Sequence, residues 1–80
     1  MENREHLLAR VAIDPEIQAG RPVIRGTRVP VARIVGALSA GASFEELRQD
    51  YGLRDEDIRA VLAYAARNLE ETEIRELPAA

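Results

Sequence analysis

Few side chains in this sequence are suited to catalysis. The 80 residues include no cysteine and one histidine, His6, so thiolate metal sites, disulfides, cysteine nucleophiles and all-histidine metal sites are excluded. No serine constellation accompanies His6, which leaves it without the neighbours that a catalytic base needs. Asp55, Glu56 and Asp57 are consecutive, and consecutive helical residues point about 100° apart, so these carboxylates cannot converge on one metal ion. We therefore expect no enzyme activity and no cofactor.

Arginines are the remaining candidates, because a guanidinium group pairs with carboxylates and phosphates through two parallel hydrogen bonds. Residues 17–44 contain four arginines and no acid, whereas residues 45–80 contain ten acids and five arginines. The net charge of −3 therefore hides a basic segment. The candidates for binding DNA or a partner protein are Arg21, Arg25, Thr27, Arg28 and Arg33. Each arginine has an alternative role, which is to pair with the acids of residues 45–57 within the fold or between subunits.

Three helices are expected behind this segment. Pro30 suits a helix start, the apolar residues that follow recur at helical spacing, and Gly41 is placed to end the helix in the left-handed conformation. Ser43 and Glu46 match the capping-box pattern, which predicts a short second helix over about residues 44–50.

The third helix is expected to begin at Asp55, because acids are favoured at a helix N-terminus. Its apolar stripe consists of Ile58, Val61, Leu62, Ala65 and Leu69. Leu62 lies in the middle of this stripe, so we predict that it is a core residue. Short turns between the three helices also meet the loose description of a helix-turn-helix.

A short β element is expected ahead of the helices. Leu7, Leu8, Val11 and Ile13 make an apolar run that stops at Asp14 and Pro15, which indicates a strand followed by a corner. Residues 22–29 are rich in β-branched side chains and include Gly26, which indicates extended chain with a kink. A three-helix unit does not obviously cover the first strand, so we expect two copies to pair through residues 8–29 into a homodimer.

The chain is expected to form one domain over residues 8–69, with an N-terminal tail over residues 1–7 and an acidic C-terminal tail over residues 70–80. No apolar run approaches the roughly 18 residues that a membrane span requires, and the N-terminus lacks the pattern of a signal peptide. We therefore expect a cytoplasmic protein that contacts no membrane.

The stretch DPEIQAGRPVIRGTRVPV, the apolar helix, GASFEEL and LRDEDIRAVLAYA together resemble the bacterial and archaeal family called domain of unknown function 433. The resemblance covers about residues 11–66, and PVIRGTR makes it specific. It implies a homeodomain-like trihelical fold behind a β element, and a VapB-type antitoxin function beside a PIN-like nuclease toxin. Arg54 stands where the family often has Thr or Ser, so we expect Asp55 to cap the third helix instead.

The leading hypothesis is a dimeric antitoxin of a type II toxin–antitoxin pair that inhibits a PIN-like ribonuclease and, together with it, represses its own promoter. Arg21, Arg25 or Arg28 would pair with the metal-binding carboxylates that the resemblance implies for the toxin, or Ile74 and Leu77 in the C-terminal tail would wrap around it. The alternative is a stand-alone helix-turn-helix regulator that binds operator DNA through the basic segment, since the acids of the third helix repel phosphates. A third class is an accessory subunit with a structural role.

Overall fold

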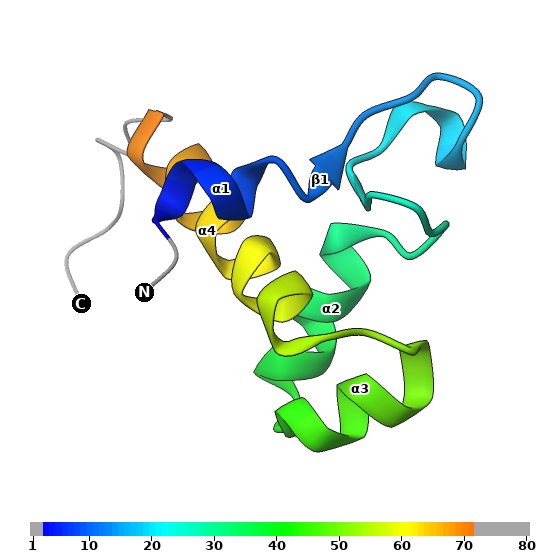
Figure 1. Ribbon diagram of the computed structural model, residues 1–80, viewed down its shortest axis with the longest axis vertical. Coiled ribbons are helices and arrows are strands. Elements are labelled where there is room, and N and C mark those ends of the chain that lie inside the picture. The colour runs from blue at the N-terminus through cyan, green and yellow to red at the C-terminus, as the bar shows by residue number, and fades with distance from the viewer. Residues whose placement is uncertain (1–2, 72–80) are drawn as a thin grey trace, which may run out of the picture.

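The computed structural model describes residues 3–71, and this part of the chain is mostly helical (Figure 1). The elements in chain order are α1 (Arg4–Leu8), β1 (Val11–Ala12), the single turn η1 (Gln18–Gly20), β2 (Val23–Ile24), α2 (Val31–Ser39), α3 (Phe44–Tyr51) and α4 (Asp55–Glu71). β1 and β2 pair antiparallel, with Val11 opposite Ile24 and Ala12 opposite Val23. The mainly helical chain with a short β element is thereby confirmed.

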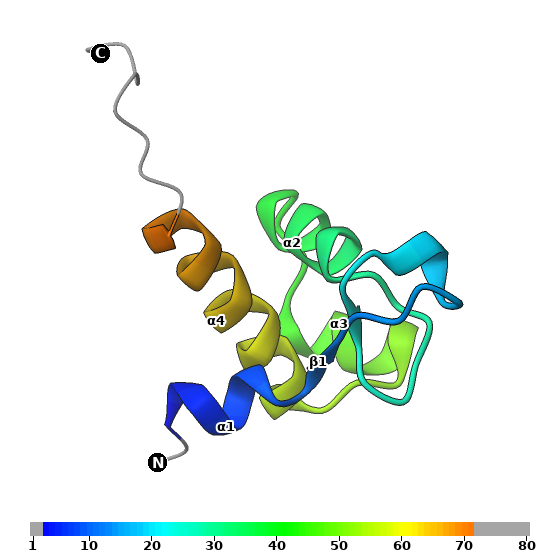
Figure 2. The same cartoon turned by 90° about the horizontal axis from the view of Figure 1, so that it is seen from above.

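α4 is the element against which the rest of the described chain packs. It contacts α1, α2, α3 and β1, and in Figure 2 it lies between α1 and α2. Ile58, Ala60 and Val61 on α4 are completely buried. They meet Ile34 of α2 and Leu47 of α3 in one apolar core, so α4 joins the other helices to each other.

Residues 22–31 form a tight hairpin in which Gly26 lies at the turn. The Ile24 N–H donates to the Val29 carbonyl at 3.0 Å, and the Thr27 N–H donates to the Ile24 carbonyl at 3.0 Å. Gly26 has φ of 82°, which side chains disfavour, so the kink expected at this glycine is a full reversal of the chain. Val23 and Ile24 are each 1% exposed, and the hairpin thus contributes two core residues.

The ends of α2 and α3 follow local sequence signals as predicted. Gly41 has φ of 97°, and the Ala42 N–H donates back to the Ala37 carbonyl at 3.0 Å, as in a Schellman C-cap. Ser43 accepts from the Glu46 N–H at 3.1 Å, and the Glu46 carboxylate accepts from the Ser43 N–H at 2.8 Å. The predicted capping box is therefore confirmed.

The strand predicted over residues 7–13 is wrong in its first half. Leu7 and Leu8 belong to α1, and only Val11 and Ala12 are in a strand. The Asn3 side chain accepts from the His6 N–H at 2.9 Å, which caps α1. Leu7 packs against the core and Leu8 lies at the junction with α4, so tertiary contacts favour the helix over a strand. The corner at Asp14 is confirmed, since its carboxylate accepts from the Glu16 N–H at 2.9 Å.

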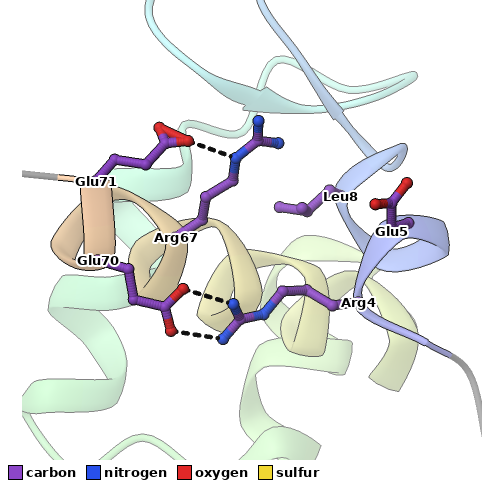
Figure 3. A pocket seen from close by; sticks show the side chains of 6 residues that line it. All are labelled: Arg4, Glu5, Leu8, Arg67, Glu70 and Glu71. Atoms are coloured by element: carbon purple, nitrogen blue, oxygen red, sulfur yellow. Dashed lines mark hydrogen bonds and ion pairs between the residues drawn. The ribbon is translucent and has the colours of Figure 1, made fainter.

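α4 continues to Glu71, two residues into the acidic C-terminal tail predicted over residues 70–80. Two ion pairs lie at this end and are drawn in Figure 3. Arg4 binds Glu70 through two hydrogen bonds of 2.7 and 3.1 Å, and Arg67 binds Glu71 at 2.8 Å. The hydrogen bond from Arg4 lowers the pKa of Glu70. Exposed ion pairs stabilise little, so the docking of α1 is the main support for the last turns.

The prediction that Leu62 is a core residue is wrong. Its exposed fraction is 45% and that of Leu69 is 62%, whereas Ile58 and Val61 are buried. The apolar stripe of α4 is wider than the side that α2 and α3 cover. Ala60 is buried instead, because α1 and β1 also pack against α4.

Asp55 does not cap α4, contrary to expectation. The Asp57 carboxylate accepts from the Arg54 N–H at 3.0 Å, while Asp55 forms an ion pair with Arg48. Asp57 is three residues after Arg54, which precedes the first helical residue. This is the position from which an acid reaches back to the free N–H group before the helix.

The two isoleucines Ile58 and Ile13 provide a matched test of the core. Ile58→Ala should lower the free energy of unfolding by about 2–5 kcal/mol, because it opens a cavity at a fully buried position. Ile13 is 61% exposed, so Ile13→Ala should cost less than about 1 kcal/mol. Urea unfolding followed by circular dichroism measures both, and equal losses would contradict the described core.

The capping box predicts a pH dependence. Hydrogen bonds from the Ser43 backbone and side chain lower the pKa of Glu46 in the folded state. A carboxyl with a lowered folded pKa stabilises the fold above its unfolded pKa, and this contribution is lost as the pH falls through the folded value. Ser43→Ala should cost about 1 kcal/mol at pH 7. The difference in the free energy of unfolding between Glu46→Gln and wild type should become smaller below about pH 4. Urea unfolding at several pH values measures it, and a difference independent of pH would contradict the role of the Glu46 carboxylate in the capping box.

Candidate functional site

The five predicted binding residues lie on the hairpin, just before it and at the start of α2, but they do not form one site. Arg25 and Thr27 line a cleft together with Arg10, Gly52, Arg54 and Asp57. Arg21 lines a separate groove between α2 and α4. Arg28 and Arg33 are exposed and belong to neither of these depressions. The sequence segment is therefore divided among three places on the surface.

Arg25 and Thr27 make hydrogen bonds within the chain that account for their residue types. The Arg25 Nε donates to the Ala9 carbonyl at 2.8 Å, and its second guanidinium nitrogen donates to the Val11 carbonyl at 3.3 Å. The Thr27 hydroxyl donates to the Ile24 carbonyl at 2.7 Å and accepts from the Val29 N–H at 3.0 Å. Arg25 thus joins the hairpin to β1, and Thr27 closes the turn.

Arg10 and Arg54 are arginines of the cleft that the sequence did not single out. Arg10 contacts Asp57 at 3.2 Å, and both side chains are largely buried. Together with Arg25 they make three arginines that line the cleft beside one aspartate, so the net charge of the lining residues is positive. Such a cleft can accept a carboxylate or phosphate group. The two residues lie outside residues 17–44, and only the fold brings them beside Arg25.

Arg21, Arg28 and Arg33 project from the surface. Within residues 3–71 their side chains have neither an ion pair nor a hydrogen bond. Of the acids that were expected to pair with the basic segment, Asp55 is instead bound by Arg48 and Asp57 by Arg10. Among the described residues, no acid pairs with these three arginines. Their charges face solvent and are accessible to a partner.

The groove that contains Arg21 is mainly apolar. It is lined by Pro22, Pro30, Val31, Ala32, Val35, Tyr64 and Ala65, with Arg21 and Asn68 as its polar side chains. It lies between the N-terminal part of α2 and the C-terminal part of α4. An extended or helical segment with apolar side chains fits this surface chemically.

A third depression lies where α1 meets α4, and ion pairs occupy it (Figure 3). Both of its arginines are already bound to glutamates, Arg4 to Glu70 and Arg67 to Glu71, so neither is free to recognise an anionic ligand. Within residues 3–71, no group of three or more His, Asp or Glu residues is placed to hold a metal ion. No helix in the described part of the chain combines the length and the apolar character needed to cross a membrane.

Comparisons with known proteins agree on one family. The family described as "Protein of unknown function (DUF433)" matches residues 11–65. The chain is 41% identical over 54 residues to the protein named "Putative antitoxin VapB45" of Mycobacterium tuberculosis, covering 68% of this chain and 23% of that protein. It is 41% identical over 59 residues to the uncharacterized protein y4eO of Sinorhizobium fredii, covering 72% and 27%. The chain thus spans about a quarter of the length of these curated relatives.

Two solved structures are similar to the chain. A DUF433 member protein from Anabaena variabilis superposes with a TM-score of 0.72 at 35% identity, covering 84% of this chain and 67% of that one. Rv2018 from Mycobacterium tuberculosis superposes with a TM-score of 0.61 at 41% identity, covering 68% and 25%.

Arg25 and Arg28 are predicted to differ in what they do for stability. Arg25→Ala removes two hydrogen bonds to backbone carbonyls and should lower the free energy of unfolding by about 1–2 kcal/mol. Arg28→Ala should change it by less than about 0.5 kcal/mol, because Arg28 is exposed and binds nothing within the described chain. Urea titration of both variants measures this, and the reverse order would show that Arg25 does not join the hairpin to β1.

Proposed function

The chain belongs to the DUF433 family, and on that premise we propose that it is the antitoxin of a type II toxin–antitoxin pair. Its partner would be a PIN-like ribonuclease, which the chain binds and inhibits. It would act as a binding protein, since its described surface offers arginines and an apolar groove but no nucleophile beside a base.

The observation that supports this proposal most is the 41% identity to the protein named as an antitoxin. The matched part is about a quarter of that protein, so the name supports a function of the shared region only as a proposal. The exposed arginines supply the chemistry. A nuclease that holds a divalent metal with carboxylates presents a cluster of negative charge, and a guanidinium group can pair with such carboxylates and displace the metal.

Arg21 and Arg28 are the better candidates for this contact. Arg25 is bound to two carbonyls of its own chain and would have to give up these hydrogen bonds to reach a partner. Arg21 also lies beside the apolar groove, so one partner segment can meet both charge and apolar surface there. Ile74 and Leu77, proposed from the sequence to wrap around the toxin, lie outside the described residues.

A second candidate function is DNA binding, either alone or as operon autoregulation together with the toxin. It is favoured by the exposure of Arg28 and Arg33, which can contact phosphates without breaking an existing interaction. The acids at the start of α4 oppose it less than the sequence suggested, because Arg48 binds Asp55 and Arg10 binds Asp57. A homeodomain-like arrangement of α2, α3 and α4 remains part of this proposal.

Homodimer formation also remains a proposal. The original reason for pairing through residues 8–29 was an uncovered strand. In the structure Val11 is 9% exposed and β1 pairs with β2 of its own chain, so that reason no longer applies.

The antitoxin proposal is tested by co-expression with a small acidic-site nuclease encoded by the neighbouring reading frame. Wild type should be captured with the nuclease and should abolish its ribonuclease activity. Arg21→Ala or Arg28→Ala should weaken capture at least about tenfold, because it leaves carboxylates of the partner unpaired. Arg67→Ala is the matched control, since Arg67 is bound to Glu71 on α4. No capture by wild type would refute the proposal.

Deletion of residues 72–80 separates the two modes of toxin binding. This deletion keeps all of α4 and both of its terminal ion pairs. Unchanged inhibition by the shortened chain would exclude wrapping by Ile74 and Leu77 and leave the arginines as the contact.

The DNA alternative is tested by titrating operator and unrelated duplexes at several salt concentrations. Each lost phosphate contact should reduce the slope of log affinity against log salt by about one unit per subunit in Arg28→Ala and Arg33→Ala. A slope that neither variant changes would exclude a phosphate contact by these two arginines.

A further inference from the structure

The structure leaves half of the apolar stripe of α4 uncovered. Leu62 and Leu69 are 45% and 62% exposed, and Ala65 and Ala66 lie between them at intermediate exposure. We call these four residues the α4 face. α1 and α2 cover other sides of the same helix, and its C-terminal end extends beyond α2 and α3 (Figure 2). Exposed leucines one above the other on a helix are typical of an interaction surface.

The spacing on the α4 face is that of a helix that packs against another helix. Leu62 and Leu69 are seven residues apart, with alanines three and four residues after Leu62. Large residues at both ends and small residues in the middle let a second helix approach closely at its centre. The buried Ile58 continues the same 3–4 spacing toward the core.

We propose that the α4 face binds a second copy of the chain, with the two α4 helices antiparallel. In this arrangement Leu62 of each copy packs on Leu69 of the other, and Ala65 and Ala66 each lie close to their own counterpart beside the two-fold axis. A symmetric pair of this kind needs a surface complementary to itself. The α4 face is complementary to itself in side-chain size, because its order of leucine, alanine, alanine and leucine is the same when the helix is reversed.

Charge complementarity supports this register. Arg59 and Glu70 lie on the same flank of α4, at about 100° and 120° from Ile58 around the helix. A two-fold axis between antiparallel helices places the same flank of both helices on one side of the pair. The register that joins Leu62 to Leu69 therefore also brings Arg59 of one copy near Glu70 of the other. Within residues 3–71 the Arg59 side chain has no ion pair, and Glu70 binds only the exposed Arg4. A parallel pair would not bring these residues together.

Two crossing helices bury less than the roughly 1,200–2,000 Å² of a standard interface, so the dimer should be in a concentration-dependent equilibrium. The inference does not depend on the proposed function, because Arg28 and Arg33 lie outside the α4 face, and of that face only Ala65 borders the groove that contains Arg21. It can hold whether the chain binds a nuclease, DNA or neither.

Sedimentation equilibrium of the full chain from about 5 to 500 μM tests the proposal. Wild type should shift from monomer to dimer over this range. Leu62→Glu and Leu69→Glu should each weaken association at least about tenfold, since they place a carboxylate in an apolar contact. Ile13→Glu is the control, because Ile13 is as exposed as Leu69 and is not part of α4. Circular dichroism melting confirms that each variant folds.

Cysteine cross-linking tests the direction of the helices, and the absence of native cysteine makes it specific. Ala66→Cys lies beside the two-fold axis and should form a disulfide-linked dimer under mild oxidation. Leu69→Cys is offset from its counterpart by about 10 Å along an antiparallel pair, which is beyond disulfide reach. Cross-linking of Leu69→Cys but not Ala66→Cys would overturn the antiparallel arrangement.

A charge exchange tests the flanking pair. Arg59→Glu and Glu70→Arg should each weaken the dimer, and the double variant should restore it, because the pair is re-formed with reversed signs. The lost Arg4 contact is common to the Glu70→Arg single variant and the double variant, so it cannot produce the rescue. A monomer at 500 μM, or a dimer that none of these substitutions weakens, would overturn the proposal.

Discussion

The burial of α4 against the other elements is the interaction on which the rest of the structure depends. Ile58 and Val61 are completely buried and join Ile34 of α2 and Leu47 of α3 in one core. Each such side chain contributes about 1.5–3 kcal/mol by leaving water, which exceeds the contribution of any exposed ion pair on this surface. A chain of 80 residues has few such side chains, so its longest described helix is packed on more than one side.

The hairpin shows how that core determines which residues face a partner. Val23 and Ile24 must enter the core, and the reversal at Gly26 then places the adjoining arginines on the outside. Arg10 and Arg48 bind two acids at the start of α4, and no arginine of residues 17–44 has an ion pair within residues 3–71. The arginines that are clustered in the sequence are therefore exposed on the surface of the fold. A basic surface of this kind suits an anionic partner, whether carboxylates or phosphates.

The proposed binding functions use different faces of the same helix-centred core. The α4 face meets a second copy, while Arg28 and Arg33 remain accessible for a partner. A dimer through α4 would therefore present two copies of the basic surface, and two linked contacts bind more tightly than one when the geometry allows both. β1 pairs with β2 of its own chain and needs no second copy, so the hairpin stays available for such a contact.

The sequence by itself determined the turn between α2 and α3 and the residue at which α4 begins. Gly41, Ser43 and Glu46 end and start helices through contacts within a few residues, and such contacts depend little on the rest of the chain. The tertiary structure decided which sides of the helices are covered: Leu62 is exposed and Ala60 is buried because α1 packs on a side of α4 that periodicity does not distinguish. It likewise decided the role of Arg25, whose carbonyl partners lie 14 and 16 residues earlier in the chain. Such long-range contacts form only when the strands pair, so no local pattern predicts them.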